Sequence, residues 1–297
     1  MSIPSIPMFT SPGNKKETLR TYQAILDRWP VPFQERMIPT GFGETHVIAS
    51  GPEDAPPLVL LHALLASAAS WYRNVNALSQ SYRVYAVDIV GEANLSCLTR
   101  PIKSLDEYLQ WFTELMDGLG VDTFSLAGNS NGGFIAAYFA MKLPERVRKL
   151  ILIGPAATIY PMTSFYVHMF IPKAMYMLLP KLPGRDAAMR RSVAWMHAGL
   201  PYDPLWEPLF YRLLVHGNSL NQVFPRVYTQ AEFAQIKAPV LLVLGEQEMI
   251  YKPRLAAEAA RELLPGLQVE LISRAHHITA LAQPEIVNQK ILHFLAG

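Results

Sequence analysis

Short, nearly continuous runs of apolar residues recur along this chain, and most of them are followed by a segment with helical spacing. Runs of this kind are typical of strands that are buried on both faces. We predict strands at residues 33–39, 44–50, 58–61, 83–87, 123–127, 147–153, 239–244 and 267–272. The apolar spacing predicts helices at residues 15–29, 104–118, 131–142, 253–263 and 284–295.

Repeated strand–helix units predict an α/β fold with a mostly parallel, doubly wound sheet. These units occupy residues 15–154 and 236–297, which we interpret as one core. Residues 1–14 are rich in Pro and Ser, and we expect them to form a loose arm. A chain of 297 residues is long enough for one large domain with an insertion.

Residues 155–235 interrupt this rhythm with many prolines and a high content of Met and aromatic side chains. We interpret this segment as a helical cap over the carboxyl ends of the strands, where ligands bind in open α/β sheets. Most of its apolar side chains are expected to pack between cap helices. Phe165, Met169 and Trp195 are the candidates for lining an apolar substrate pocket.

Charge and composition favour a soluble enzyme over a nucleic-acid or membrane protein. A net charge of +2 gives no electrostatic basis for binding to nucleic acid or to an anionic membrane. No run approaches eighteen uninterrupted apolar residues, so no membrane span is expected. The single cysteine, Cys97, forms no internal disulfide, and the start of the chain lacks the pattern of a signal peptide. We therefore expect a cytoplasmic monomer or small homo-oligomer.

The segment from Gly128 to Gly132 reads Gly-Asn-Ser-Asn-Gly and carries the strongest functional signal. It lies between the predicted strand at 123–127 and the predicted helix at 131–142. A G-x-S-x-G sequence in that setting holds its serine on a strained, exposed turn. The glycines are needed because side chains at their positions would collide with the neighbouring strand and helix. We predict that Ser130 is a nucleophile; the alternative is a serine in an ordinary glycine-rich turn.

Four further segments carry a resemblance to a known family, namely residues 43–62, 85–91, 244–251 and 283–288. Together with the Ser130 motif they resemble the α/β-hydrolases and, within that superfamily, the bacterial carboxylesterases of the naproxen-esterase type. The resemblance is weakest in the cap. It implies an α/β-hydrolase fold with an inserted helical cap. It also implies a serine hydrolase that cleaves small carboxylic esters with an apolar acyl or aryl part.

The resemblance indicates a base for Ser130. The family's histidine lies in a loop after the last strand, seven residues before the proline that opens the final helix. Pro284 is seven residues beyond His277, so His277 is the expected base. His276 stands where the family usually has a glycine, and we expect it to be a neighbouring polar side chain.

An acid must orient the histidine, and the loop after residues 239–244 offers Glu246 and Glu248. The superfamily's acid usually falls three residues after the glycine of this loop, which indicates Glu248. The alternative for Glu248 is a solvated loop charge. No carboxylate occupies residues 154–157, the other acid position of this fold.

The oxyanion of an acyl-transfer intermediate needs two backbone N–H donors. We expect these to be Asn131, directly after the nucleophile, and Leu64, in the loop after residues 58–61. The resembled family carries a His-Gly pair in that loop, whereas this chain has His62 and Ala63. If Ala63 needs a positive φ, its side chain costs about 1 kcal/mol. His62 and Ala63 are also candidates for contact with the substrate.

Other functions remain open. The motif is also similar to that of carbon–carbon bond hydrolases that cleave vinylogous diketone acids. Such a substrate carries a carboxylate and would need a basic residue in the pocket, for which Arg190 and Arg191 are candidates. An acyltransferase would use the same triad. A non-catalytic ligand-binding protein with a hydrolase fold is the alternative from another class.

No metal or cofactor is expected. No group of His, Cys and Asp has the spacing of a metal site, and no phosphate-binding loop or dinucleotide fingerprint occurs. The expected partner is a small-molecule ester substrate.

Overall fold

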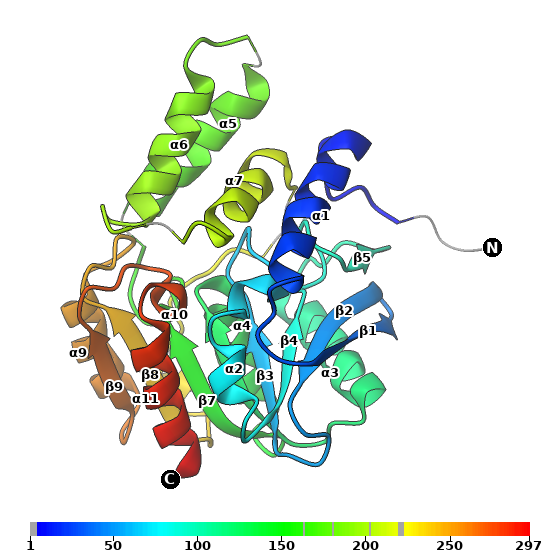
Figure 1. Cartoon of the computed structure of the whole chain (residues 1–297). Helices are drawn as coiled ribbons and strands as arrows, with labels where there is room; N and C mark the ends of the chain where they lie inside the picture. The colour runs from blue at the N-terminus through cyan, green and yellow to red at the C-terminus, as the bar shows by residue number, and fades with distance from the viewer. Residues whose placement is uncertain (1–4, 163, 180, 202, 219–222) are drawn as a thin grey trace.

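The described residues form a nine-stranded sheet at the centre of the fold (Figure 1). Helices lie on both faces of this sheet. The computed structural model describes residues 5–162, 164–179, 181–201, 203–218 and 223–297. The strands are β1 (Phe33–Thr40), β2 (Gly43–Ser50), β3 (Pro57–Leu61), β4 (Arg83–Val87), β5 (Cys97–Leu98), β6 (Phe124–Asn129), β7 (Val147–Ile153), β8 (Val240–Gly245) and β9 (Gln268–Ile272).

The strand order is β1-β2-β4-β3-β6-β7-β8-β9, with the short β5 paired to β2. The six strands from β4 to β9 along this order run parallel, while β1 and β2 are antiparallel to their neighbours. The continuous apolar runs explain the burial, because Leu150–Ile153 and Leu242–Val243 have no exposed surface. All eight predicted strands are present, and β5 is the addition.

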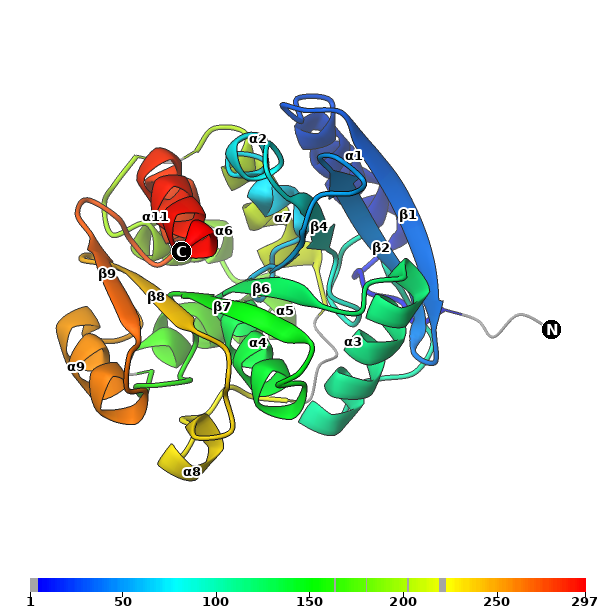
Figure 2. The same cartoon turned by 90° about the horizontal axis from the view of Figure 1, so that it is seen from below.

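Helices cover both faces of the sheet. In Figure 2, α3, α4 and α9 lie on one face, and α2 and α11 lie on the other. Their bounds are α1 (Pro12–Leu26), α2 (Val75–Leu78), α3 (Leu105–Leu119), α4 (Asn131–Lys142), α9 (Pro253–Leu263), α10 (Thr279–Ala282) and α11 (Pro284–Ala296), with a 3-10 turn η1 at Ala68–Trp71. The five predicted helices correspond to α1, α3, α4, α9 and α11. The fold of the predicted core is therefore the expected α/β arrangement.

The interval between β7 and β8, where we predicted a cap, holds several helices. They are η2 (Tyr166–Phe170), a π-helical turn, α5 (Ile171–Leu178), α6 (Arg185–Met196), α7 (Trp206–His216) and α8 (Gln230–Phe233). Figure 2 shows α8 apart from the others. In Figure 1, α5 and α6 form a pair that projects beyond the sheet, and α7 lies closer to it. Several large apolar side chains of this region are exposed, including Leu178 (78%) and Phe224 (65%).

The N-terminal segment differs from the expected loose arm. Met8 and Phe9 are buried, the Ile6 N–H donates to the Leu98 carbonyl, and the Thr10 N–H donates to the His216 carbonyl. Helix α1 begins at Pro12, three residues before the predicted start, because proline fits the first helical turn and Ser11 caps it. The segment around Met8 and Phe9 is thus packed on the protein; residues 1–4 of the predicted arm lie outside the described residues.

Candidate active site

Ser130 lies on the sharp turn between β6 and α4, with φ of 51° and ψ of −114°. A Cβ atom at Gly128 would lie 2.3 Å from the Gly132 carbonyl oxygen. A Cβ atom at Gly132 would lie 2.4 Å from the Leu61 carbonyl oxygen. Both glycines are therefore required by close backbone approach, and the positive φ of Ser130 is the strained conformation that the motif predicts.

The structure brings the three predicted side chains together from distant parts of the sequence. Nε2 of His277 lies 2.8 Å from Oγ of Ser130, and Nδ1 of His277 lies 2.8 Å from Oε2 of Glu248. The side chains of His277 and Glu248 are 2% and 0% exposed. A carboxylate only accepts hydrogen bonds, so Nδ1 carries the proton and the lone pair of Nε2 faces the serine hydroxyl.

Backbone groups fix the Glu248 carboxylate in the loop after β8. The N–H groups of Met249 and Ile250 donate to Oε1 at 2.8 and 3.0 Å, while Oε2 is left for His277. Each oxygen therefore has its own partner, which sets the orientation of the carboxylate. Glu246, the other sequence candidate, lies 4.0 Å from the guanidinium of Arg254.

His276 has surroundings that keep it neutral. Its Nδ1 accepts the Ile278 N–H at 3.2 Å, and its ring lies edge-on to His197. Burial, followed by the nearby His197 and His277, lowers the pKa of His276 from 6.5 to about 3. The structure thus gives the contact with Ser130 to His277, as predicted, and leaves His276 as a neighbouring side chain.

The loop after β3 faces Ser130 across a cavity. Leu64 and Leu65 line this cavity together with Ser130 and Asn131. The residue with a left-handed backbone is Leu65, with φ of 56°, and not Ala63. The condition for strain at Ala63 is therefore not met; the turn places its unfavourable conformation two residues later. Asn131 begins α4 directly after Ser130.

His62 does not line either cavity near Ser130, so it is not the substrate contact that we predicted. The side chain is fully buried, its Nδ1 donates to the Ala63 carbonyl at 2.8 Å, and its Nε2 accepts the Ile89 N–H at 2.9 Å. Burial lowers the pKa of His62, which agrees with one donating and one accepting nitrogen. His62 thus ties the loop to the end of β4.

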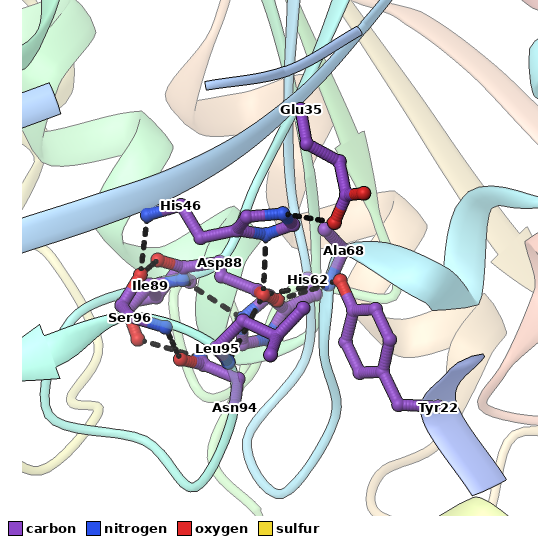
Figure 3. Close-up of polar contacts among 10 residues, drawn as sticks. All are labelled: Tyr22, Glu35, His46, His62, Ala68, Asp88, Ile89, Asn94, Leu95 and Ser96. Atoms are coloured by element: carbon purple, nitrogen blue, oxygen red, sulfur yellow. Dashed lines mark hydrogen bonds and ion pairs between the residues drawn. The ribbon is translucent and has the colours of Figure 1, made fainter. Parts of the chain in front are cut away.

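A buried polar network lies behind the same loop (Figure 3). Its centre is Asp88, whose Oδ1 accepts the Ala68 N–H at 2.7 Å, just where η1 begins. Its Oδ2 accepts bonds from the Tyr22 hydroxyl at 3.1 Å and from Nδ1 of His46 at 2.9 Å. Nε2 of His46 lies 3.0 Å from a carboxylate oxygen of Glu35. The network anchors the loop to α1, β1 and β2.

The network holds a buried ion pair between His46 and Asp88. Burial alone would lower the pKa of His46, but its hydrogen bonds and charge interactions with Asp88 and then Glu35 outweigh burial and raise it above 6.5. Burial would raise the pKa of Asp88, but the hydrogen bond and charge of His46 lead the effects that lower it. Both shifts stabilise the charged forms of the pair.

Two cavities meet at Ser130. The smaller has a volume of about 40 Å³ and the larger about 430 Å³, and Ser130, Leu64 and Leu65 line both. The smaller one is also lined by Ala63, Trp71, Met196, Trp206, Phe210, His277 and Leu281, among others. The larger one extends under η2 and α5 and includes Met162, Tyr166, Phe170, Lys173, Met177 and Phe224. Ser130 therefore faces apolar space on two sides.

The cap residues predicted to line the pocket have different positions. Phe165 and Met169 line both cavities. Trp195 lines neither of them; its ring stacks on His168 at a centroid distance of 4.4 Å, so the substrate contact predicted for it is wrong. Spacing along a helix does not show which face is turned toward a cavity, and α6 turns Trp195 toward η2.

The basic residue that lines the larger cavity is not one of the two candidates from the sequence. Lys173 lines the larger cavity, whereas the candidates Arg190 and Arg191 do not. Arg190 lies over the Tyr211 ring, and Arg191 is exposed and donates to the Ala187 carbonyl. The available signal was a single lysine inside the otherwise uncharged stretch from residue 169 to 180.

Within the described ranges, no group of three or more His, Cys, Asp or Glu residues is arranged to hold a metal ion. No helix within those ranges is long and apolar enough to cross a membrane.

A family model, similar sequences and similar solved structures all relate this chain to the same family. The model of the alpha/beta hydrolase fold family matches residues 56–282. Carboxylesterase YbfK of Bacillus subtilis is 39% identical over 292 residues, which is 94% of each chain. The crystal structure of carboxylesterase CesB (YbfK) from the same organism has a TM-score of 0.87 at 34% identity and covers 95% of this chain and 98% of its own. Naproxen esterase (carboxylesterase NP), also from Bacillus subtilis, gives 0.86 at 32% identity over 98% of this chain and all of its own.

Proposed function

This chain belongs to the α/β hydrolase fold family and, within it, to the bacterial carboxylesterases, and from that premise we propose a serine esterase that works through an acyl-enzyme on Ser130. One observation carries the proposal: the hydrogen-bonded series from Ser130 through His277 to Glu248, with both distances at 2.8 Å. Such a series supplies the base and the orienting acid that a serine hydroxyl needs.

In the proposed first step, Oγ of Ser130 attacks the ester carbonyl carbon while its proton passes to Nε2 of His277. Glu248 stabilises the imidazolium that forms, and it holds the ring in place. The tetrahedral intermediate then collapses, the carbon–oxygen bond to the alcohol breaks, and the alcohol leaves with the proton from Nε2. An acyl group remains on Ser130.

Deacylation repeats these steps with water as the nucleophile. Water adds to the acyl carbonyl and gives one proton to His277, which returns it to Oγ of Ser130 as the carboxylic acid is released. In both steps the backbone N–H groups of Asn131 and Leu64 are the proposed donors to the oxyanion. The position of Asn131 at the N-terminus of α4 supports this role, because that end of the helix favours negative charge.

The proposed substrate is a carboxylic ester with an apolar acyl or aryl part. The two cavities at Ser130 support it, since most of their lining side chains are apolar or aromatic. Phe165 and Met169 lie between the two spaces and are the proposed substrate contacts from the cap, together with Ala63 from the loop after β3. No residue in this scheme calls for a metal or a cofactor.

The experiment for this proposal is hydrolysis of p-nitrophenyl esters from acetate to octanoate. Wild type is compared with Ser130→Ala and with the control Ser81→Ala. Ser81 is exposed and does not line either cavity at Ser130. We expect turnover by wild type and by the control, and its loss in Ser130→Ala. A fluorophosphonate should label wild type and the control but not Ser130→Ala. Absence of both turnover and labelling in wild type would overturn the proposal.

The same panel separates the alternatives. A carbon–carbon bond hydrolase or an acyltransferase would share the labelling of Ser130 but fail to release acid from simple esters in water. A ligand-binding protein without activity would show no labelling. Ester hydrolysis is preferred because two relatives that match nearly the whole chain are carboxylesterases.

A cytoplasmic location and a monomeric or small homo-oligomeric state are also part of the proposal. The unpaired Cys97 supports the cytoplasmic location.

A further inference from the structure

Lys173 is the one charged side chain among the described residues that line the larger cavity beside Ser130. The remaining lining residues described there are apolar or uncharged polar. Thr163, Pro180, Tyr202 and residues 219–222 lie outside the described ranges, and their side chains are uncharged. The described lining of the cavity that leads to Ser130 therefore contains a single cationic group in mostly apolar surroundings.

The ammonium group of Lys173 keeps hydrogen-bonding capacity toward this cavity. Its Nζ donates to the Gly217 carbonyl at 2.9 Å. An ammonium has three N–H donors, so two remain without a partner within the described ranges. Asn218 follows Gly217 directly and lines the same cavity, which brings a second polar side chain close to Lys173. These groups form a polar corner in an apolar space.

Among the described residues, no carboxylate lines this corner as a partner for Lys173. Burial lowers the pKa of Lys173, and the carboxylate of Glu92 raises it in part. Glu92 is not among the described residues that line the cavity. A partly buried cation of this kind is stabilised when an anion binds beside it, because the anion restores the interactions lost on leaving water.

We propose that the substrate carries a carboxylate remote from the scissile ester bond and that Lys173, assisted by Asn218, binds this carboxylate. The substrate class is then a monoester of a dicarboxylic acid whose apolar spacer lies between Ser130 and α5. The inference rests on the proposed esterase function and adds its specificity. It also assigns to Lys173 the anion recognition for which Arg190 and Arg191 were the sequence candidates.

The test compares two p-nitrophenyl esters of the same dicarboxylic acid, one with a free distal carboxylate and one with that carboxylate capped as a methyl ester. The readout is the ratio of kcat/KM for the free over the capped substrate, measured across several spacer lengths. Wild type is compared with Lys173→Met, Lys173→Arg and the control Lys181→Met, which removes an exposed cap lysine outside the cavity. A charge-assisted hydrogen bond predicts a ratio at least about tenfold lower in Lys173→Met.

The supporting result is that loss in Lys173→Met, partial recovery in Lys173→Arg and a wild-type ratio in Lys181→Met. Turnover of the capped substrate with a ratio that Lys173→Met does not change would overturn this inference and leave the esterase function standing. A readout without turnover is the binding of the free-carboxylate ester to Ser130→Ala by calorimetry. Binding that does not weaken in Ser130→Ala/Lys173→Met would contradict the inference whatever the outcome for catalysis.

Discussion

The turn at Ser130 and the cap helices hold their side chains by different physical means. At the turn, the backbone itself is confined: the Ser130 N–H donates to the Ile153 carbonyl, and the Ser130 carbonyl accepts from Phe134 and Ala156. In the cap, hydrogen bonds such as that from Lys173 to the Gly217 carbonyl occur beside much apolar contact, and residues such as Leu178 and Val167 remain largely exposed. Hydrogen bonds and close backbone approach define a single backbone conformation at the Ser130 turn. Apolar packing in the cap tolerates several side-chain arrangements.

Under the proposed function, this difference predicts that the chemistry depends on the core and that substrate preference depends on the cap. A substitution at the Ser130 turn or its partners should change the rate or the stability strongly. A cap substitution should change which substrate is preferred and leave the fold intact. The following predictions test this division, beginning with the largest effect.

Glu248→Gln should lower kcat by about a thousandfold to ten-thousandfold, because an amide in place of the carboxylate no longer stabilises the imidazolium and can select the wrong tautomer of His277. Steady-state hydrolysis of a p-nitrophenyl ester measures the effect. The matched control is Glu246→Gln in the same loop, which should retain wild-type kcat. Equal losses in the two variants would argue that the loop, and not the Glu248 carboxylate, matters.

Gly132→Ala should destabilise the protein by about 3 kcal/mol or more, because its Cβ would meet the Leu61 and His62 carbonyl oxygens at 2.4 and 2.5 Å. Gly199→Ala in the cap places its Cβ in open space, so only the positive φ of 75° costs energy, about 1 kcal/mol. Urea unfolding of both variants gives the comparison. Similar losses of unfolding free energy would contradict the distinction between the two regions.

His46→Gln should lower Tm more at pH 6 than at pH 9. The pKa of His46 is raised above 6.5 in the folded protein, so the stabilisation by its charged form is complete below that value. It is then lost as pH rises through the raised pKa. The lowered pKa of Asp88 keeps its carboxylate charged in this window. A Tm difference that stays constant over this range would show that the His46–Asp88 pair does not contribute through its charge.

Phe165→Ala should change the preferred acyl length and lower kcat/KM by up to about tenfold for the best wild-type substrate, with a small change in Tm. Phe165 lines both cavities but is only partly buried, so its removal enlarges the substrate space more than it disrupts the core. Leu255→Ala, at an exposed apolar position of α9, is the control. An unchanged chain-length profile in Phe165→Ala would remove it from the proposed pocket.

Much of the core was predictable from sequence because its determinants are local. Continuous apolar runs predict buried strands. The two glycines around Ser130 mark a turn in which the backbone segments approach too closely for a side chain at either position. The approach of His277 and Glu248 to Ser130 was expected from the family resemblance, since both loops follow strands that end at the same edge of the sheet. Their catalytic roles stay a proposal.

The remaining errors concern residues whose environment comes from distant segments. The positive φ lies at Leu65 and not at Ala63, where it was considered, since the loop conformation depends on Glu92 accepting the Leu65 N–H and Asp88 accepting the Ala68 N–H. Nothing local shows that His62 is held by Ile89 or that Met8 and Phe9 pack into the protein. The surroundings of Lys173 and Trp195 depend on how each cap helix is rotated about its own axis. Apolar spacing in the sequence does not determine that rotation.

The most direct test of the central claim is mass spectrometry of wild-type protein quenched during turnover of a p-nitrophenyl ester. The account predicts an added acyl mass on the peptide that contains Ser130, a smaller amount of it after longer reaction, and none in Ser130→Ala. An acyl adduct on a residue other than Ser130, or an adduct that still forms in Ser130→Ala, would contradict the account.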